Sequence, residues 1–423
     1  MEHKNQLYIT NVKVAAHRIA IHYEVSGAWQ KYFADRDFFA VYSEDLSGLP
    51  ESVAVIPFLA NVIPIAWYHH GEIFVDTLDR AFYACLPDVL RGYQNMYPAI
   101  ALSGTLTVQT LENNSVQGDA AGVFFSGGVD SYYSLLQHME EQPHLLTIWG
   151  ADIRLDDTEG WHRVKEHSRL VAEQYALPYH TIQSNFRTIL DEGALSAALP
   201  EQGFSWWHEF QHGIGILSMA APITYVYGIR KVYMASTCTV DRGSFTCASD
   251  PTIDNYVRYH SCRMVHDGYE AGRQDKIRFL VTYAGQRHTG LPLRVCWESA
   301  GGGNCGVCEK CCRTMTAIYL EDGDPADFGF ADCRANSFSA IGSRLKRRIR
   351  MEYAAACYWE HIHARLLEKY TIHTCPRAWR WFYRGGVVSV NRNLEFRLHC
   401  ICTRIGRKLR KIMNSVRRRI WRS

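Results

Sequence analysis

Ser126-Gly127-Gly128-Val129-Asp130-Ser131 joins an apolar run at residues 122–125 to a segment at residues 132–138 that has the composition of a helix. The run predicts a buried strand, and the following segment predicts a helix. Glycines let a backbone approach a ligand closely, and the first turn of a helix presents free N–H groups and the positive end of its dipole. A strand, a glycine turn and a helix start therefore predict a binding site for phosphate groups.

The polar side chains of this loop favour a nucleotide over a purely structural glycine turn. Ser126 and Ser131 supply hydroxyl donors, whereas the carboxylate of Asp130 would repel a bare phosphate and is expected to hold Mg²⁺ beside it. The Walker loop needs a lysine after its glycines, and this stretch has none. We interpret Asp130 and Ser131 as catalytic residues. The predicted nucleotide-binding residues are Ser126, Gly127, Gly128, Val129, Asp130 and Ser131.

Four cysteines further along the chain have the spacing of a metal site. They are Cys296, Cys305, Cys308 and Cys311, which read C-x8-C-x2-C-x2-C. Four thiolates suit a tetrahedral Zn²⁺ and leave no open position, so the predicted zinc is structural and not catalytic. Cys312 is an alternative to the fourth ligand, with poorer spacing. Scattered core cysteines and an iron–sulfur cluster are the other interpretations.

An SGGxDS loop at the start of a domain and a C-x8-CGxC-x2-C knuckle near its end resemble the PP-loop ATP pyrophosphatases, the adenine nucleotide alpha hydrolase-like superfamily. The pair is similar to the 7-cyano-7-deazaguanine synthases over about residues 118–320. This resemblance implies a HUP-like parallel sheet and an enzyme that uses ATP to activate a carboxylate, which ammonia then converts to a nitrile. It also implies that Lys276 lies near the phosphates, where it would neutralise leaving pyrophosphate. A solvent-exposed helix lysine is the alternative interpretation.

Two segments differ from this family where it would recognise its base. Trp149-Gly150-Ala151-Asp152 stands in place of the family's Tyr-Gly-Gln, and His208-Glu209-Phe210-Gln211-His212 replaces its Arg-Asn pair. The resemblance therefore extends to the residues expected to bind ATP and zinc, and less to the residues expected to bind the substrate. We expect the acceptor to be a deazapurine, a sugar acid or a group on a partner protein. Candidates to line its pocket, or alternatively to pack in the core, are Trp206, Trp207, His208 and His212.

The chain as a whole predicts an α/β fold in three parts. Residues 1–117 predict a small α+β domain. Residues 118–335 alternate strands and helices, which predicts a doubly wound parallel sheet with a zinc knuckle and with ligands at the carboxyl ends of its strands. Residues 336–423 predict a helical region with a basic tail. The strand ends also supply Asp152, Ser236, Thr237 and the segment Ser249-Asp250-Pro251.

Apolar periodicity places the elements within these parts. Expected strands cover residues 7–14, 18–25, 38–42, 73–76, 102–111, 122–125, 145–149, 180–183 and 231–235. Expected helices cover residues 78–93, 132–138, 161–176 and 209–227, and residues 52–65 are helix-like or buried.

The composition restricts the class of protein. The chain has 423 residues, 47% of them hydrophobic, and lacks the apolar stretch of about eighteen residues that predicts a membrane span. The polar start at residues 1–6 lacks the apolar core of a signal peptide. A cytoplasmic protein is expected, and its fourteen cysteines then indicate metal ligands and buried thiols rather than disulfides.

The net charge of +3 conceals a basic tail. Residues 403–423 contain nine Lys and Arg and no acidic residue, with apolar residues at helical spacing. Such a helix packs on its own protein, lies on the anionic inner face of a membrane, or binds RNA through its phosphates. These are three alternative interpretations. Members of the resembled superfamily often dimerise, which implies a homodimer.

These observations predict an ATP-dependent ligase that forms a carbon–nitrogen bond by adenylating a carboxylate. The second hypothesis is a PP-loop enzyme that transfers sulfur to a tRNA base, although the knuckle uses the best-placed thiols. The third is a non-catalytic subunit that binds the nucleotide without turnover. ATP, Mg²⁺ and Zn²⁺ are the expected cofactors, and a small-molecule carboxylate or a partner protein is the expected acceptor.

Overall fold

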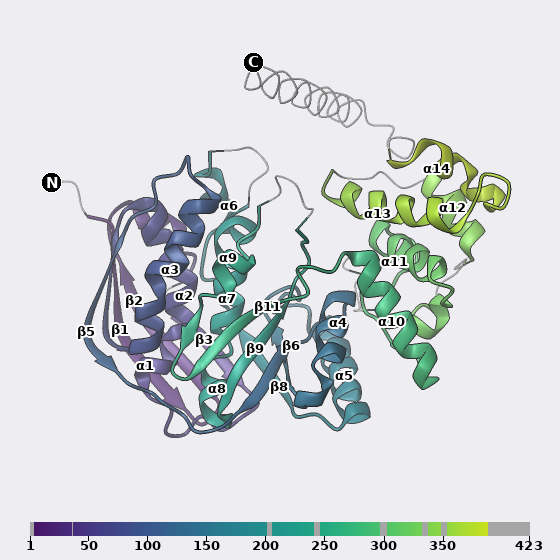
Figure 1. The fold of residues 1–423 in the computed structure, drawn as a ribbon. Helices are drawn as coiled ribbons and strands as arrows, with labels where there is room; N and C mark the ends of the chain where they lie inside the picture. The colour runs from purple at the N-terminus through teal and green to yellow at the C-terminus, as the bar shows by residue number, and fades with distance from the viewer. Residues whose placement is uncertain are drawn as a thin grey trace, which may run out of the picture. The chain divides into compact units, whose positions relative to one another are not determined.

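The computed structural model describes residues 4–35, 37–200, 205–240, 246–296, 303–331, 337–347 and 353–387. These residues form two compact units, with the boundary between Ala271 and Gly272 (Figure 1). The first unit contains a large sheet with helices, and the described elements of the second are helices. None of the described helices is long and apolar enough to cross a membrane.

The first unit contains one sheet of eleven strands in the order β10-β11-β9-β6-β7-β8-β3-β2-β1-β4-β5. Most neighbouring pairs are parallel, and the antiparallel ones are β10–β11, β8–β3, β3–β2 and β2–β1. The predicted α/β class is therefore confirmed. The strands are β1 Gln6–Ala15, β2 Arg18–Val25, β3 Asp37–Tyr42, β4 Glu72–Asp79, β5 Thr105–Glu112, β6 Ala120–Phe124, β7 His144–Trp149, β8 Tyr179–Ser184, β9 Ile229–Ala235, β10 Arg258–Tyr259 and β11 Cys262–Asp267.

Five of these strands, in the order β8-β7-β6-β9-β11, run parallel. Helices α4 (Val129–Gln137) and α5 (Thr158–Tyr175) contact one face of them, and α9 (Pro251–Asp254) lies with the helices of the other face (Figure 1). β6 is apolar and buried because both faces are covered. The strand order reverses between β6 and β9, which is where ligands bind in folds of this kind.

The chain between β8 and β9 differs from the single helix expected over residues 209–227. After α6 (Glu192–Ala197) comes a π-helical turn at Trp207–Gln211, then α7 (His212–Ser218) and α8 (Ala221–Tyr227). Pro222 lies in the first turn of α8, where a missing N–H is harmless, but inside one long helix it would break the hydrogen-bond ladder. Its position at the start of α8 is compatible with the break after α7, whereas Pro64 and Pro87 lie inside α2 (Ile56–His69) and α3 (Arg80–Met96).

The N-terminal strands belong to the same sheet as the strands after residue 118. β3 pairs antiparallel with β8, and Tyr42 lies opposite Ile182. Asn185 fixes this junction, because its Oδ1 accepts from Phe39 N at 2.8 Å and its Nδ2 donates to Asp37 O at 2.8 Å. The three-part division near residues 117 and 335 stays a prediction, and the two compact units divide the chain elsewhere.

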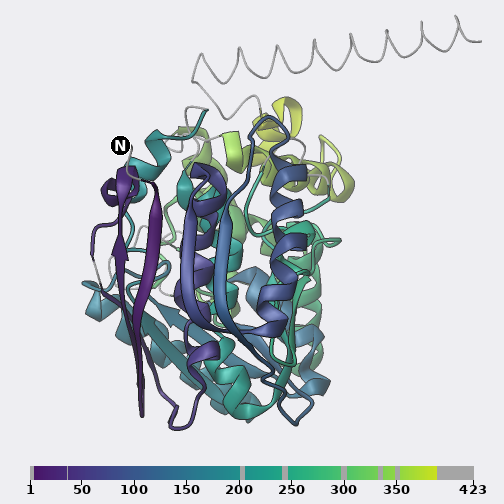
Figure 2. The same cartoon turned by 90° about the vertical axis from the view of Figure 1, so that its left-hand side faces the viewer.

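The strand order requires this sheet to fold over. β5 and β6 are consecutive in the sequence but seven steps apart in the sheet, which is about 34 Å when flat. The chain from Glu112 to Ala120 reaches at most about 28 Å. The sheet therefore curves, and Asp79 at the end of β4 accepts a hydrogen bond from His260 N beside β10 at 2.8 Å. Figure 2, seen from the side of β1 and β2, shows these strands in front of the helices they cover.

Helices α1 (Glu51–Ala54), α2 (Ile56–His69) and α3 (Arg80–Met96) all contact β4 (Figure 1). α2 contacts β4 and β5 as well as α7. Every residue from Ile56 to Trp67 is buried, which accounts for a helix that is apolar on all sides. Its one polar residue there, Asn61, accepts from Gln211 Nε2 at 2.8 Å and donates to Pro57 O at 2.8 Å.

The second unit is built around aromatic side chains. Trp359, Trp379 and Phe382 are buried, and both tryptophans contact the phenyl ring. Glu321 is buried too, and both of its oxygens accept from Arg365 at 2.9 Å. The elements are α10 Arg273–Arg287, α11 Glu309–Leu320, η4 Pro325–Phe328, α12 Phe338–Arg347, α13 Tyr353–Lys369, η5 Arg377–Trp379 and α14 Arg380–Gly385. The basic tail predicted over residues 403–423 lies outside the described residues.

Candidate functional site

The loop after β6 connects the strand directly to the start of a helix. Phe125 N donates to Leu146 O on β7 at 2.8 Å, which continues the sheet by one residue. Gly127 has a φ of +76°, in the left-handed region that favours glycine, and Gly128 is the last residue before α4. The first N–H groups of α4 therefore lie in the loop, where no turn of helix precedes them.

Ser131 braces this loop from inside. Its side chain is buried, and its Oγ donates to Gly128 O at 3.1 Å. The same Oγ accepts from Ser126 N at 3.4 Å and lies 3.3 Å from Ser126 Oγ. Ser126 is exposed, so it is the predicted hydroxyl donor that reaches the surface. A catalytic role for Ser131 stays a prediction.

Asp130 lies next to the turn that follows β9. Thr237 Oγ1 donates to Asp130 Oδ2 at 3.5 Å. Because β6 and β9 are parallel neighbours, the loop and this turn lie at the same edge of the sheet. The structure thus brings together two residues that the sequence placed at separate strand ends.

A buried polar network lies behind this turn. Ser236 Oγ lies 2.7 Å from His266 Nε2 at the end of β11, and His266 Nδ1 lies 2.8 Å from Asp254 Oδ2. Ser249 Oγ donates to the same carboxylate oxygen at 2.7 Å. Asp250 caps α9 by accepting a backbone N–H at 2.8 Å. Sequence reasoning missed His266, whose one signal was a polar residue at the end of an apolar strand.

The aromatic residues before α7 differ in their surroundings. Trp206 is fully buried and stacks on Phe210 at 4.8 Å between ring centroids, so the core interpretation holds for it. Trp207 is partly exposed, with the Arg187 guanidinium over its ring at 4.0 Å and the His212 ring at 5.1 Å. Trp207 and His212 remain candidates for contact with an acceptor.

His212 is a neutral imidazole. Burial lowers its pKa to about 4, although the Asp152 carboxylate acts in the opposite direction. Its Nδ1 lies 3.6 Å from Cys247 Sγ, and burial raises the pKa of that thiol. Burial also lowers the pKa of His208. Both imidazoles are therefore proton acceptors at neutral pH and not cations.

The four predicted zinc ligands converge in the second unit. The Sγ atoms of Cys296 and Cys308 lie 3.8 Å apart, and those of Cys305 and Cys311 lie 3.9 Å apart. All four sulfurs lie within 4.8 Å of one another. A tetrahedron with zinc–sulfur bonds of about 2.3 Å has edges of about 3.8 Å. The cluster could therefore hold a metal ion such as zinc.

Backbone N–H groups point at these sulfurs. Cys305 Sγ accepts from Val307 N at 3.4 Å and from Cys308 N at 3.3 Å. Cys308 is the N-cap of α11, and its Sγ accepts from Cys311 N at 3.4 Å. Hydrogen bonding with the Cys311 side chain lowers the pKa of Cys308 to about 5. Such donors favour the thiolate, which is the form that binds a metal.

Asn304 ties the first ligand to the other three. Its Oδ1 accepts from Val295 N at 2.9 Å and from Cys296 N at 3.2 Å. Its Nδ2 donates to two backbone carbonyls at 2.7 and 2.9 Å. Because Asn304 directly precedes Cys305, one side chain holds the two parts of the cluster together. Sequence reasoning missed it, since an asparagine beside a cysteine has no spacing that marks it.

Cys312, the alternative fourth ligand, is not part of the converging set. Its Sγ lies 3.7 Å from Val307 O and 3.9 Å from Arg344 Nη1. Arg344 also donates to Gly306 O at 2.6 Å, inside the knuckle. The structure therefore brings Cys311, and not Cys312, together with the other three cysteines.

Lys276 lies on α10 in the second unit, whereas the glycine loop belongs to the first. Its side chain is buried, so the alternative of a solvent-exposed helix lysine is wrong. The neighbouring Asp275 accepts from Gly272 N at 3.1 Å and caps the helix. A role for Lys276 beside phosphates stays a prediction.

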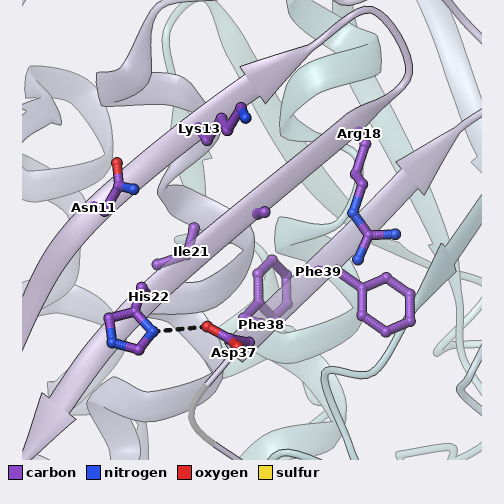
Figure 3. A pocket seen from close by; sticks show the side chains of 9 residues that line it. Asn11, Lys13, Arg18, Ile21, His22, Asp37, Phe38 and Phe39 are labelled. Atoms are coloured by element: carbon purple, nitrogen blue, oxygen red, sulfur yellow. Dashed lines mark hydrogen bonds and ion pairs between the residues drawn. The ribbon is translucent and has the colours of Figure 1, made fainter.

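A pocket of about 290 Å³ opens on β1, β2 and β3 (Figure 3). Within it, His22 Nδ1 lies 2.7 Å from Asp37 Oδ1, and the Arg18 guanidinium lies 4.6 Å from the centre of the Phe39 ring. None of the site residues predicted from the sequence lines this pocket, so the pocket does not coincide with the glycine loop.

Neither a scan against protein-family models nor a search of curated proteins found a match. The function must therefore follow from the residues of this chain.

Proposed function

We propose that this chain is an ATP-dependent ligase that adenylates a carboxylate and joins it to nitrogen. The observation that carries the proposal is the loop between β6 and α4, at the reversal of strand order, with Asp130 in its first helical turn. The left-handed Gly127 and the helix start offer N–H donors to phosphates, and the carboxylate offers a ligand to Mg²⁺. These features also carry the likeness to the PP-loop ATP pyrophosphatases.

In the proposed reaction, a carboxylate oxygen of the acceptor attacks the α-phosphorus of ATP. The new O–P bond replaces the bond to pyrophosphate, which leaves. The nitrogen nucleophile then attacks the acyl carbon, AMP leaves with the electrons of the C–O bond, and the nitrogen loses a proton. Mg²⁺ supplies positive charge when bound. Asp130 would hold that ion beside the phosphates.

The four-cysteine cluster is proposed to be a zinc site that stabilises the second unit. Four thiolates fill a tetrahedral coordination shell and leave no position for substrate or water. The cysteines therefore have no part in the adenylation step.

A deazapurine acid is the first acceptor to test. Trp207 and His212 offer ring surfaces to a planar base, and Arg187 offers a guanidinium to a carboxylate. A sugar acid or a carboxylate on a partner protein is the second class, because residues 149–152 and 208–212 differ from the resembled family.

The test is release of pyrophosphate from ATP by the full-length, zinc-loaded protein. It would be run with 7-carboxy-7-deazaguanine plus ammonia and with a panel of sugar acids. Acceptor-dependent formation of AMP and pyrophosphate is the expected result. Binding of ATP without turnover would instead favour a nucleotide-binding subunit. Thiolated RNA among the products would favour sulfur transfer.

Asp130→Ala should lower the rate of pyrophosphate release by on the order of a hundredfold or more, because it removes the carboxylate proposed to hold Mg²⁺ beside the phosphates. The thermal unfolding midpoint should stay unchanged. Glu140→Ala is the matched control, since Glu140 is an exposed acidic residue beyond the end of α4. Equal rates for Asp130→Ala and the wild type would contradict the proposed site.

A further inference from the structure

The network behind the turn after β9 is buried. Ser236 and Asp254 have no exposed surface, and His266 is 8% exposed. These residues come from the end of β9, from α9 and from the end of β11. Buried polar groups that are hydrogen-bonded at 2.7–2.8 Å hold separate segments in one fixed arrangement.

The number of hydrogens fixes the direction of these bonds. Ser236 Oγ has one hydrogen, which it donates to Cys238 O at 2.7 Å. His266 Nε2 must then carry a hydrogen that it donates to Ser236 Oγ. One further proton lies between His266 Nδ1 and Asp254, as an imidazolium facing a carboxylate or as an imidazole facing a carboxylic acid. Burial raises the pKa of Asp254, which favours retention of this proton.

The network ends at the backbone that faces the glycine loop. Ser236 N donates to Asp267 O at 2.8 Å, and Ser236 Oγ fixes Cys238 O, so both sides of Thr237 are held. Thr237 is the residue that reaches Asp130 Oδ2 at 3.5 Å. The position of Asp130 is therefore connected to the imidazole by hydrogen bonds through the Ser236–Cys238 turn.

We propose that His266 is a positioning residue of the ATP site, which sets the Ser236–Cys238 turn through Ser236 and thereby places Asp130 for Mg²⁺ and ATP. This inference rests on the proposed function, because it assigns ATP and Mg²⁺ to the glycine loop. His266 does not touch the nucleotide in this role. The network acts through Thr237.

Two serine variants test the proposal, because both remove hydrogen bonds of 2.7 Å from the same network: Ser236→Ala removes two, and Ser249→Ala removes one. Ser236→Ala disconnects the turn from His266, whereas Ser249→Ala removes a bond to Asp254 and leaves the turn connected. Ser236→Ala is expected to raise the Kd and the KM for ATP with Mg²⁺ by about tenfold at nearly constant kcat. Ser249→Ala should match the wild type in Kd and KM, although both variants should lower the unfolding midpoint.

Calorimetric titration of ATP and Mg²⁺ into the full-length wild type and both variants separates the outcomes. Weaker binding by Ser236→Ala alone supports the role of His266. Equal affinity for all three proteins overturns it and leaves the proposed function intact. A wild type that binds no ATP overturns both.

A conservative variant of Asp254 gives a second measurement, which a purely structural role of His266 would leave unchanged. In Asp254→Asn the side-chain amide can donate to His266 Nδ1 and to Ser249 Oγ, so the imidazole keeps its orientation while the extra proton is lost. ATP affinity should then stay near that of the wild type, and the nitrogen NMR shifts of His266 in this variant should be those of a neutral ring with its hydrogen on Nε2. Asp254→Ala should lose both the affinity and the ring orientation, and equal affinity in Asp254→Ala and the wild type would overturn the proposal.

Discussion

Gly213 allows α7 to pack directly on a buried carboxylate. A Cβ at this position would collide with Ala248 O and with Asp254 Oδ1. Gly213→Ala should therefore lower the free energy of unfolding by about 1–3 kcal/mol, measured by urea denaturation. Gly285→Ala is the control, because a Cβ there meets no atom and an alanine on α10 should raise stability by about 0.5–1 kcal/mol. A neutral Gly213→Ala would mean that α7 can shift.

At the scale of single residues, the sequence predicted those roles that depend on neighbouring positions in the chain. Gly127 could be predicted as a loop glycine because the strand before it and the helix after it are contiguous with it. Gly213 and His266 could not, since their partners Asp254 and Ser236 lie thirty or more positions away in the chain. Only the folded sheet brings those groups into contact.

Helix α11 begins at the metal cluster, and this is where a ligand variant should act. Cys308→Ser should abolish tight zinc binding and lower the unfolding midpoint of the full-length protein, because one of four thiolates is lost while the serine hydroxyl can still cap α11. Cys312→Ser is the matched control, buried beside the cluster but outside it. Zinc content by metal analysis is the measurement. Full zinc content in Cys308→Ser, or loss of zinc in Cys312→Ser, would contradict the assigned ligands.

At the scale of elements, most strands and helices could be predicted from periodicity, and the cysteine knuckle from its spacing. Three of the four ligands lie within seven residues, so local geometry almost determines them. The long helix expected over residues 209–227 was wrong: the apolar pattern continues through the segment, but the structure divides it into a π-helical turn, α7 and α8. Apolar periodicity predicts which face of a helix is buried, but it does not predict at which residue the helix ends.

For the whole molecule, the continuous sheet makes the first 117 residues part of the fold of the first unit. A fragment of residues 118–423 would expose the edge of β8 that pairs with β3, and it would remove α2 from α7. We expect this fragment to be insoluble or to unfold without cooperativity, and co-expression of residues 1–117 should restore it. Expression yield and thermal unfolding of the purified fragment measure this. A soluble fragment with a cooperative transition would instead support a domain boundary near residue 117.

The strands of residues 1–117 were predicted one by one, but their place in the sheet was not. A strand pattern reports length and the buried face, and it carries no information about the partner strand. The pairing of β3 with β8 depends on Asn185, whose two backbone contacts lie about 146 positions away. The parallel centre could be predicted from alternating strands and helices, since those connections are local.

Cys308 belongs both to α11 and to the cysteine cluster, so a metal bound there is a ligand of the folded state. By mass action, each tenfold rise in free metal above its Kd would add about 1.4 kcal/mol to the free energy of unfolding. With zinc in this site, the stability of the second unit would be a function of the zinc supply. Depletion of zinc would then decrease the folded fraction of the protein with no change in its sequence.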